Sequence, residues 1–390
     1  MRTQVGIIGA GPAGLLLARL LSRQGIESVV LERRSASYVL GRVRAGVLER
    51  STAALLEDAD CAERMRHEGL PHDGFSINFD DHTLRIDLTE LAGGSVIIYG
   101  QTEMTRDLMA ARAAEGAATL YEAEVTAIAD VDTSRPRILF QHGGREQHID
   151  CDFIAGCDGF HGPSRGHIPS AIVQVFERTY AFAWLGVLAD VPPCSDELVY
   201  ASHADGFALA SMRSRTRSRY YIQCPANTRL EEWPDDRFWM EFERRAGPQT
   251  ARHVTRGPSI EKSLAPLRSF VAEPMRHGRL FLAGDAAHIV PPTGAKGLNL
   301  AASDVGLLAR ALAAFYTSGN SDLLDSYSSR CLARVWKAER FSWWMTSLLH
   351  RFPDTDVFGR RLQKAEFDYL NSSRAAQTAL AENYIGLPLS

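Results

Sequence analysis

A glycine-rich turn near the start of the chain restricts the possible folds more than any other segment does. Residues 4–8 (QVGII) form an apolar run, the turn GAGPAG follows at residues 9–14, and apolar residues then recur at helical spacing up to Leu21. The next apolar run, from Ser28 to Leu31, predicts a second strand. Strand, glycine turn, helix and strand in this order predict a Rossmann-like α/β unit, in which the helix N-terminus faces a pyrophosphate.

Glu32 makes this prediction more specific, because it stands about 20 residues after the turn, at the end of the second predicted strand. A carboxylate at this place can accept hydrogen bonds from the two ribose hydroxyls of an adenosine. Its charge would repel the 2′-phosphate of NADP, so the site favours FAD or NAD. The simpler alternative is a glycine turn followed by an unrelated surface glutamate.

A later segment favours FAD over NAD. Residues 278–288 contain an apolar strand that ends in Gly284-Asp285, and the loop 290–297 precedes another predicted helix. Asp285 can accept hydrogen bonds from a ribityl chain, and the helix start beyond Gly297 can offer N–H groups to a flavin ring. Reduced flavin carries negative charge, which a helix N-terminus stabilises. An NAD enzyme has no use for this second nucleotide contact, so we expect FAD.

The chain of 390 residues is longer than one hydrophobic core usually serves. Segments rich in β-branched and aromatic residues interrupt the α/β pattern and suggest an inserted, mainly antiparallel sheet. We therefore expect an FAD-binding domain (residues 1–71, 100–179 and 268–350), a substrate-binding β domain (residues 72–99 and 180–267) and a C-terminal helical interface segment (residues 351–390). One large mixed sheet is the alternative.

The composition argues against several classes of function. Acidic and basic residues almost balance, at a formal net charge of −4, which gives no electrostatic reason to expect nucleic acid or a membrane as partner. The six cysteines are scattered without a CxxC pair, so we expect reduced thiols and no metal site. Because neither a signal peptide nor an apolar run of about 18 residues is found, we expect a cytoplasmic protein.

A third motif, CDGFHGPSR at residues 157–165, follows another apolar strand and contains Asp158. Together and in this order, the three motifs resemble those of the group A flavoprotein monooxygenases. Six longer runs are similar to the bacterial 4-hydroxybenzoate 3-monooxygenase family: residues 40–49, 99–109, 155–165, 217–223, 281–304 and 337–356. The similarity extends over essentially the whole chain, with a one-residue shortening between Gly94 and Ile98.

This resemblance implies a fold and a reaction. The fold would be a GR2-type Rossmann-like FAD-binding domain with an inserted antiparallel β domain and C-terminal helices, and the protein would form a homodimer. The reaction would convert 4-hydroxybenzoate, NADPH (or NADH) and O2 to 3,4-dihydroxybenzoate and water through a flavin C4a-hydroperoxide. Three alternatives stay open: a related hydroxylase for another aromatic acid, a flavin reductase or oxidase without oxygen insertion, and a flavin-binding regulatory protein.

The resemblance also assigns a clamp for the substrate carboxylate. Ser211 and Arg213 stand two residues apart on a predicted strand and would point to one face, with Tyr221 across a hairpin. A guanidinium and hydroxyl donors suit a carboxylate. Arg215 and Arg217 continue the alternation, and we interpret them as a solvated hairpin tip.

A proton relay for the substrate phenol follows from the same resemblance. Tyr200 would face the phenol, with Tyr384 behind it and His72 at the solvent end, where a histidine can release the proton to water. Pro291-Pro292 cannot continue a hydrogen-bonded strand, which leaves carbonyl oxygens free to face a ligand. The resemblance puts the Pro292 carbonyl beside the reacting oxygen.

Further residues match positions that hold the two cofactors. The matches to FAD contacts are Gly9, Gly11, Gly14, Glu32, Arg42, Arg44, Gln101, Asp158, Arg219, Asp285, Lys296, Gly297, Leu298 and Asn299. The matches to NADPH contacts are Arg33, Arg34, Tyr38, His161, Arg165 and Arg268. Two adjacent arginines suit a 2′-phosphate, although relatives that prefer NADPH often carry glutamine at position 34.

Overall fold

The computed structural model describes residues 1–42, 46–80 and 82–388, so Arg44, an expected flavin contact, lies outside the described residues. The first elements are those predicted: β1 (Val5–Ile8), α1 (Pro12–Arg23) and β2 (Ser28–Glu32). They belong to a six-stranded sheet of order β18-β19-β12-β1-β2-β8. Its other strands are β8 (Thr119–Tyr121), β12 (Phe153–Gly156), β18 (Arg276–His277) and β19 (Leu280–Leu282). All pairings are parallel except that of β18 with β19.

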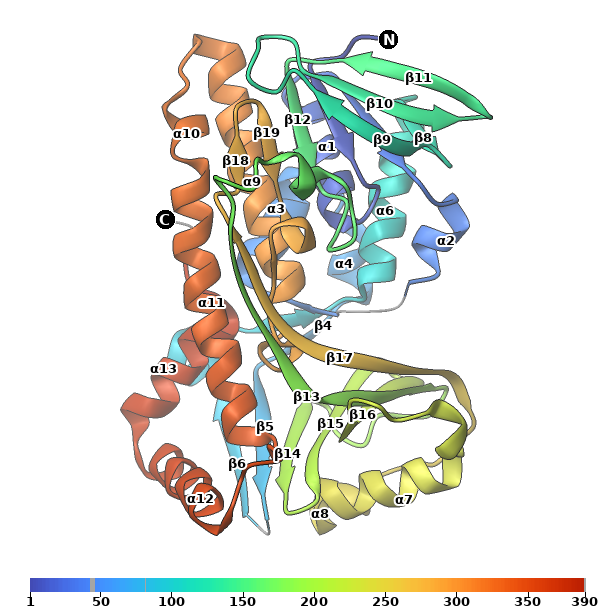
Figure 1. Ribbon diagram of the computed structural model, residues 1–390. Helices are drawn as coiled ribbons and strands as arrows, with labels where there is room; N and C mark the ends of the chain where they lie inside the picture. Colours follow the sequence, from blue (N-terminus) through green and yellow to red (C-terminus); the bar gives the residue numbers. More distant parts are fainter. Residues whose placement is uncertain (43–45, 81, 389–390) are drawn as a thin grey trace.

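Helices and a meander pack around this sheet (Figure 1). Helices α6 (Gln101–Ala114) and α9 (Gly297–Ser318) pack against α1. Strands β9 (Glu124–Ala129), β10 (Arg137–His142) and β11 (Arg145–Asp150) form the antiparallel meander. A Cβ at Gly6 of β1 would collide with Ile138 of β10, so glycine lets the meander close on the sheet. Helix α9 has the length and hydropathy of a membrane span, but 78% of its apolar window is buried inside the protein, as in a core helix.

A separate sheet of eight strands forms much of the lower part of Figure 1, in the order β20-β17-β13-β16-β15-β14-β5-β6. Its strands are β5 (Gly74–Phe79), β6 (His82–Asp87), β13 (Gln174–Ala189), β14 (Leu198–His203), β15 (Gly206–Ser214), β16 (Arg217–Pro225), β17 (Ser259–Glu273) and β20 (His288–Ile289). Only the pairing of β14 with β5 is parallel. The predicted inserted antiparallel sheet is thus confirmed, and the alternative of one large mixed sheet is wrong.

The long strands β13 and β17 connect the two parts of the molecule (Figure 1). They pair from Gln174 with Glu273 at one end to Ala189 with Ser259 at the other. Both strands continue without a break across a predicted domain border. The border lies between residues 179 and 180 in β13 and between residues 267 and 268 in β17. The division into domains stays a prediction.

Short elements lie between the two large sheets. A three-stranded sheet of order β3-β7-β4 consists of β3 (Val47–Leu48), β4 (Leu70–His72) and β7 (Val96–Ile98). The neighbouring helices are α2 (Ala36–Leu40), α3 (Arg50–Asp58), α4 (Glu63–Glu68) and α5 (Leu88–Ala92). Helices α7 (Asp235–Ala246) and α8 (Pro248–Ala251) follow β16, and α7 packs on β14, β15 and β16.

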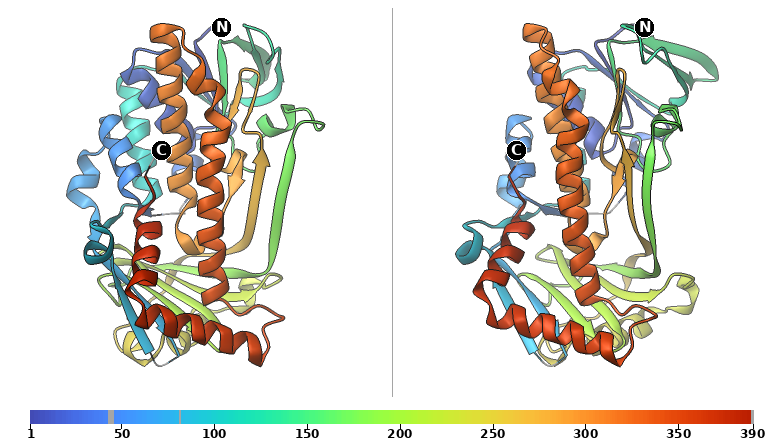
Figure 2. Two further views of the ribbon diagram at one scale, coloured as in Figure 1. Left: turned by 90° about the vertical axis from the view of Figure 1, so that its left-hand side faces the viewer. Right: turned by 60° about the vertical axis from the view of Figure 1, so that its left-hand side comes forward.

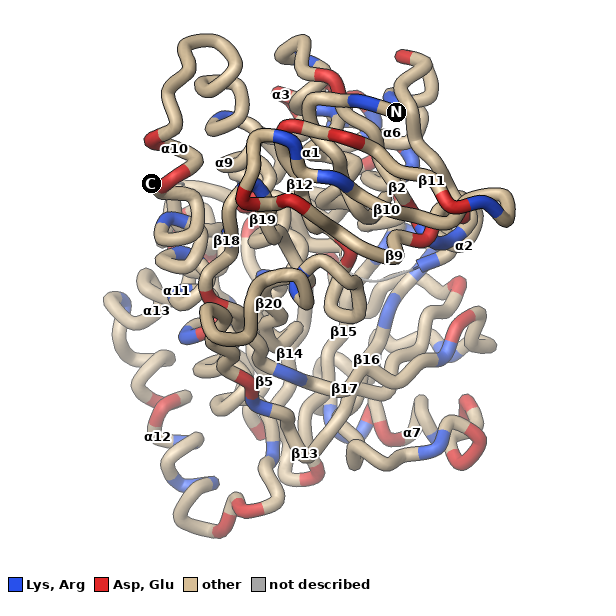
Figure 3. Tube along the Cα trace, turned by 45° about the horizontal axis from the view of Figure 1, so that its top comes forward, with Lys and Arg blue, Asp and Glu red and all other residues tan. Residues whose placement is uncertain are grey.

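The C-terminal residues form α10 (Asp322–Asp325), α11 (Tyr327–Leu349), α12 (Val357–Ser372) and α13 (Arg374–Ile385). In Figure 2, α11 runs along the molecule, whereas α12 crosses its base and α13 turns back. Helix α13 packs on α5 and β6, which brings the end of the chain to the region between the sheets. Figure 3 shows basic and acidic residues interspersed along the described trace, in keeping with the small net charge.

Candidate active site

The three glycines of the first turn have different surroundings. Gly9 has a φ of +103°, and a Cβ there would collide with the carbonyl of Cys157. A Cβ at Gly14 would overlap the Gly9 carbonyl, so this glycine lets α1 approach the turn closely. Gly11 has nothing within 4 Å of its Cβ position. The turn therefore opens at Gly11, at the positive end of α1, where a pyrophosphate can approach the N–H groups.

Glu32 lies at the end of β2, as predicted. Its carboxylate accepts hydrogen bonds from the backbone N–H of Ala10 at 2.9 Å and of Arg34 at 2.8 Å. These bonds fix the carboxylate beside the glycine turn, where an adenosine ribose would lie. Since each carboxylate oxygen has a second lone pair, both can still accept a ribose hydroxyl.

Asp158 follows β12 and lies next to the same turn. Its Oδ2 accepts a hydrogen bond from the backbone N–H of Ser164 at 2.8 Å. Its Oδ1 is buried without a hydrogen-bond partner among the described residues, and burial raises the pKa of this carboxyl. A buried acceptor without a donor is costly, and a hydroxyl of a bound cofactor would supply that donor.

The segment after β19 is held from behind by Asp304 of α9. Its Oδ2 accepts from the backbone N–H of Gly284 at 2.9 Å and lies 2.6 Å from Nε2 of the buried His288. Gly284 has a φ of +61°, which a glycine adopts without strain, and Asp285 follows it at the start of a short 3-10 turn. Asp304 and His288 thus fix the loop that carries Asp285.

The start of α9 offers a second helix N-terminus. Nothing lies within 4 Å of a Cβ at Gly297, and the first N–H groups of an α-helix have no partner inside the helix. Leu298 is buried behind this turn. The open glycine turn, the unpaired Asp158 oxygen and this helix end together fit FAD, which would span from Glu32 to α9.

The side chain of Asn299 is fully hydrogen-bonded within the protein. Its Oδ1 accepts from Glu49 N at 2.9 Å and from Thr52 Oγ1 at 2.7 Å. Its Nδ2 donates to Val47 O at 3.0 Å and to Ala295 O at 2.8 Å. The amide therefore joins α9 to β3 and α3, and the contact of Asn299 with a flavin stays a prediction.

Two other predicted flavin contacts are less constrained. Arg42 is exposed, with its guanidinium 5.9 Å from the ring centre of Tyr38. Gln101 is half-buried at the start of α6. Their contacts with a flavin stay predictions.

The structure brings two of the predicted relay residues together. The hydroxyl oxygens of Tyr200 on β14 and Tyr384 on α13 lie 2.8 Å apart, although the residues are far apart in the sequence. Phe75 stacks on Tyr384 with ring centres 4.2 Å apart and meets Tyr200 edge-on at 5.6 Å. Both tyrosines are buried, and burial raises both pKa values above the usual value for tyrosine.

His72 is not at a solvent end, and this part of the prediction is wrong. The side chain lies in β4 and is only 1% exposed. Its Nε2 lies 3.1 Å from the sulfur of Met212, and its Nδ1 is buried without a partner among the described residues. Burial lowers the pKa of His72 to about 4, because charging the ring would cost hydration. The sequence could not show the burial of His72, because the side chain that it contacts, Met212, is 140 residues away.

The structure brings the residues of the predicted carboxylate clamp together, although the register of β15 with β16 shifts between Met212 and Ser214. Tyr200 pairs with Leu209 of β15, and Leu209 pairs with Tyr221 of β16, so the three side chains form one row on one face. Ser211 is two residues from Leu209 and points to the same face. Arg213 Nη1 donates to Ser211 Oγ at 2.7 Å, and its guanidinium also hydrogen-bonds Tyr221. Burial lowers the pKa of Arg213 although Tyr221 opposes this shift.

Arg219 lies beside the clamp. Its guanidinium donates to Glu261 at 2.9 Å and to Ser263 at 2.7 Å, and it stacks 5.2 Å from the ring centre of Tyr221. It is 3% exposed, so it differs from Arg217, which pairs with Asp190 at the surface. The interpretation of Arg217 as solvated is confirmed, whereas the flavin contact of Arg219 stays a prediction.

Pro292 begins a 3-10 turn, and its carbonyl accepts a hydrogen bond from the N–H of Ala295 at 3.0 Å. The expectation that this carbonyl is left free is therefore wrong. Its second lone pair can still face a ligand.

Two groups of arginine and aromatic side chains lie at the predicted NADPH positions. Phe160 has the guanidinium of Arg268 at 4.4 Å and that of Arg165 at 5.0 Å from its ring centre, with His161 edge-on at 4.9 Å. In the other group, Arg34 lies 5.2 Å from the ring centre of Tyr38. The members of the second group are exposed: Arg33, Arg34 and Tyr38.

Lys296 is buried below α9, and its partners were not predicted. Its ammonium donates to Glu49 at 2.6 Å and to the Tyr384 carbonyl at 3.0 Å. Glu49 also pairs with Arg334 of α11 at 2.9 Å. Burial lowers the pKa of Lys296, although Glu49 opposes the shift. Neither Glu49 nor Arg334 carried a sequence signal beyond membership in matched or adjacent runs, because their contact joins distant segments.

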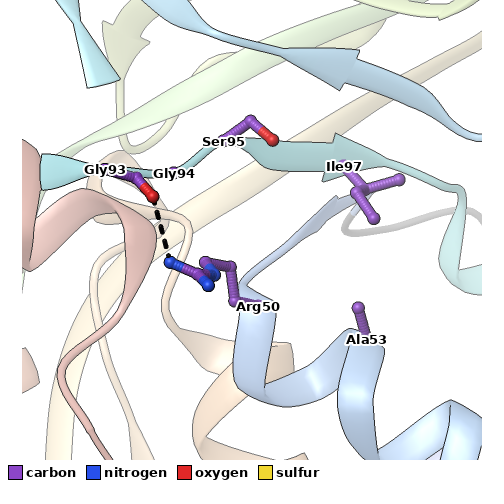
Figure 4. A pocket seen from close by; sticks show the side chains of 6 residues that line it. All are labelled: Arg50, Ala53, Gly93, Gly94, Ser95 and Ile97. Carbon is purple, nitrogen blue, oxygen red and sulfur yellow. Dashed lines mark hydrogen bonds between the residues drawn. The ribbon is translucent and has the colours of Figure 1, made fainter. Parts of the chain in front are cut away.

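A cavity of about 390 Å³ opens beside α3 (Figure 4). Arg50 reaches across it and donates to the Gly93 carbonyl at 3.2 Å. The cavity contains none of the predicted site residues; it is lined by Arg50, Ala53, Gly93, Gly94, Ser95 and Ile97.

The nucleotide turn, the helix end at α9 and the row of Tyr200, Leu209 and Tyr221 on the second sheet fit a flavin-dependent aromatic hydroxylase. Residues 2–342 match the family described as "FAD binding domain", and the chain belongs to this family of flavin monooxygenases. The predictions of family, fold class and enzyme type are thereby confirmed.

One relative is similar over the full length: the chain is 55% identical over 389 residues to p-hydroxybenzoate hydroxylase of Acinetobacter baylyi, covering 100% of this chain and 96% of that protein. A 3-(3-hydroxy-phenyl)propionate/3-hydroxycinnamic acid hydroxylase of Burkholderia vietnamiensis is 28% identical over 348 residues, which cover 84% of this chain and 60% of that protein. The solved structure of p-nitrophenol 4-monooxygenase from Pseudomonas putida DLL-E4 superposes with a TM-score of 0.84 at 19% identity, covering 99% of each chain, and supports the fold alone.

Proposed function

We propose that this FAD-dependent hydroxylase converts 4-hydroxybenzoate to 3,4-dihydroxybenzoate with NADPH and O2. The observation that carries the proposal is the row of side chains on one face of the second sheet. Tyr200, whose hydroxyl meets that of Tyr384, stands at one end of this row, and Tyr221 stands at the other, where Ser211 and Arg213 lie next to it. A para-substituted benzoate has a carboxylate and a phenol at its two ends, which matches this arrangement. The full-length relative of Acinetobacter baylyi supports the same substrate.

The chain's own residues would bind and ionise the substrate. Arg213, Ser211 and Tyr221 would hold the carboxylate through charge-assisted hydrogen bonds. Because burial raises the pKa of Tyr200, its hydroxyl stays protonated and can donate a hydrogen bond to a phenolate oxygen. The Tyr384 hydroxyl would take the proton of Tyr200 as Tyr200 takes that of the phenol, and would release its own proton to water. A phenolate attacks an electrophilic oxygen far better than a phenol does, and bound FAD supplies the reduction and O2 activation.

The holoenzyme should consume NADPH, O2 and 4-hydroxybenzoate in equal amounts and form 3,4-dihydroxybenzoate. Tyr200→Phe should still bind the substrate and accept hydride, but hydroxylate poorly and release peroxide. Tyr220→Phe is the matched control, because that buried tyrosine points to the other side of the sheet, against Trp239 and Phe242. Full coupling in Tyr200→Phe, or a product from another aromatic acid only, would contradict the proposal.

We also propose NADPH as the preferred reductant, bound on the surface. The adjacent exposed Arg33 and Arg34 suit the 2′-phosphate, and the cationic group of Arg165 and Arg268 around Phe160 suits further phosphates. Steady-state kinetics should give a higher kcat/KM with NADPH than with NADH, and Arg33→Ala should reduce this preference. Equal or better efficiency with NADH would defeat the proposal.

A homodimer is proposed from the outer face of α12. Phe358, Leu362 and Tyr369 are spaced i, i+4, i+11 and therefore share one helix face, where they are 70%, 56% and 56% exposed. Such a stripe suits the same face of a second copy. Light scattering should give twice the chain mass, and Phe358→Asp with Leu362→Asp should give monomers. Asn371→Asp, on the opposite face of the helix, should stay dimeric. A monomeric unmodified protein would refute this.

The cytoplasm is the proposed location. It holds the reduced nicotinamide pool on which the reaction would depend, and it keeps thiols reduced. All six cysteines are free and buried, in keeping with that compartment. Cell fractionation that finds the protein in a membrane or secreted fraction would contradict the proposal.

A further inference from the structure

Glu49 is a buried acid held between two cations. Its side chain is 2% exposed, with Lys296 Nζ at 2.6 Å from Oε1 and Arg334 Nη2 at 2.9 Å from Oε2. Lys296 is the N-cap residue of α9, whereas Arg334 lies on α11. A buried carboxylate is costly unless it is paired, and two partners from different helices satisfy both of its oxygens.

The same two cations also hold the last turn of α13 and the residues after it. Lys296 Nζ donates to the backbone carbonyl of Tyr384 at 3.0 Å. Arg334 Nη1 donates to the carbonyl of Leu387 and, at 3.3 Å, to that of Pro388. Between them Gly386 has a φ of +100°, and a Cβ there would collide with the Glu49 carboxylate. Residues 384–388 therefore lie directly on the Glu49 group, and we call them the C-terminal strap.

The strap carries the second tyrosine of the hydroxyl pair. Tyr384 is in the last turn of α13, where helix ends fray unless tertiary contacts hold them. Its ring stacks on Phe75, a contact that has no hydrogen-bonding direction of its own. The 2.8 Å contact with Tyr200 requires a fixed position along the helix axis, which backbone contacts provide.

We infer that Arg334 is a positioning residue for hydroxylation, which holds Tyr384 in hydrogen-bonding reach of Tyr200 by binding Glu49 and the strap carbonyls. Arg334 touches neither tyrosine. This inference rests on the proposed function, because an effect on phenol ionisation requires that the substrate is 4-hydroxybenzoate. The planar guanidinium serves three acceptors at once, and the ammonium of a lysine has a different geometry.

The decisive experiment compares Arg334→Met with Lys337→Met in FAD-loaded enzyme. Lys337 is an exposed residue on the same helix, so the control removes the same charge without touching the strap. The phenol pKa of bound 4-hydroxybenzoate is read from its ultraviolet difference spectrum across pH. Arg334→Met should raise this pKa by about one unit, while the rate of flavin reduction by NADPH stays that of the unmodified enzyme. Lys337→Met should leave both unchanged.

Two further variants separate position from charge. Gly386→Ala keeps every charge but forces the strap away from Glu49, and it should raise the phenol pKa as Arg334→Met does. Arg334→Lys keeps the charge and should restore the pKa only in part. A phenol pKa in Arg334→Met equal to that of the unmodified enzyme would overturn the inference, and so would complete restoration by lysine together with no effect of Gly386→Ala.

A second readout does not depend on the substrate. Hydrogen exchange of the backbone amides in residues 380–387 should be faster in Arg334→Met than in Lys337→Met, because the strap loses its anchor. If the unmodified enzyme does not bind 4-hydroxybenzoate, the proposed function fails, while this exchange still tests the anchoring by Arg334. Equal exchange in the two variants would overturn the inference. If Arg334→Met does not fold, Gly386→Ala and Arg334→Lys provide the same comparison.

Discussion

Gly11 and Gly14 stand three residues apart in one turn, yet the space around them differs completely. Gly14 is closed in by the Gly9 carbonyl, whereas the Cβ position of Gly11 is open. Sequence pattern treats the two as equal members of one motif. The structure separates a glycine needed for the fold from a glycine needed for the ligand.

Gly11→Ala should fold normally, because Gly11 has φ −71° and ψ 178°, which alanine adopts without strain. The added methyl group would occupy the opening at the N-terminus of α1, so the Kd for FAD should rise at least tenfold. Gly14→Ala should instead reduce the free energy of unfolding of the apoprotein by about 1–3 kcal/mol, through overpacking against backbone. FAD titration and urea unfolding of both variants check this, and similar behaviour of the two would contradict it.

Arg213 offers a second test at this scale, because its guanidinium binds in a fixed planar geometry. Arg213→Lys should raise the Kd for 4-hydroxybenzoate by about 10- to 100-fold, the loss expected when hydrogen bonds to a charged group worth about 1.5–3 kcal/mol are removed. Equilibrium titration of the flavin absorbance measures it. Arg215→Lys is the matched control on the exposed hairpin tip, and an equal effect there would remove the clamp assignment.

At the scale of elements, the first turn of α9 is fixed by its junction with β3 and α3. Asn299 makes hydrogen bonds to Glu49, Thr52, Val47 and Ala295, all within 3.0 Å. The position of the α9 N-terminus thus depends on the side-chain amide of Asn299, a residue that the family resemblance predicts to contact FAD. The physical reason is that the Asn299 amide ties the first turn of α9 to Val47 of β3 and to Thr52 of α3.

Asn299→Ala should leave several buried polar groups without partners and reduce the free energy of unfolding by about 2–4 kcal/mol. The apoprotein should also bind FAD more weakly, because the start of α9 loses its anchor. Denaturant unfolding with and without FAD measures both effects. Asn371→Ala, exposed at the end of α12, should change stability by less than about 0.5 kcal/mol. A loss at Asn299 no larger than this would contradict the role.

For the whole molecule, the packing of α11 against the second sheet buries a titratable ring. His350 lies 1% exposed beside Trp184, which donates to its Nε2 at 2.7 Å, while its Nδ1 lies 3.1 Å from the Thr346 carbonyl. Burial lowers the pKa of His350 to about 3, as it lowers that of His72 to about 4. Both rings are therefore neutral in the folded protein at neutral pH.

Acid should destabilise the protein through these two rings. Below the ordinary histidine pKa near 6.5, the unfolded chain binds protons that the folded protein excludes, so the stability present above pH 6.5 is lost as pH falls toward about 4 and 3. Each ring contributes a slope of about 1.4 kcal/mol per pH unit at most. Denaturant unfolding between pH 6 and 4.5 should give a shallower slope in His350→Gln by about this amount. An unchanged slope would contradict the burial of the neutral ring.

The sequence by itself determined the features that depend on short stretches of chain. The strand–turn–helix unit with Glu32 and the succession of α/β and β-rich segments follow from local pattern, and the structure confirms them. Arg213 does meet Ser211, although the strand register shifts between Met212 and Ser214. Motif similarity further predicted the meeting of Tyr200 with Tyr384.

Only the tertiary structure decided the burial and the hydrogen-bond partners of the individual side chains at the site. It buried His72, used the Asn299 amide for packing, gave the Pro292 carbonyl a donor, and joined Glu49, Lys296 and Arg334. Desolvation and hydrogen-bond satisfaction depend on segments hundreds of residues apart, and the sequence does not state which of them come into contact.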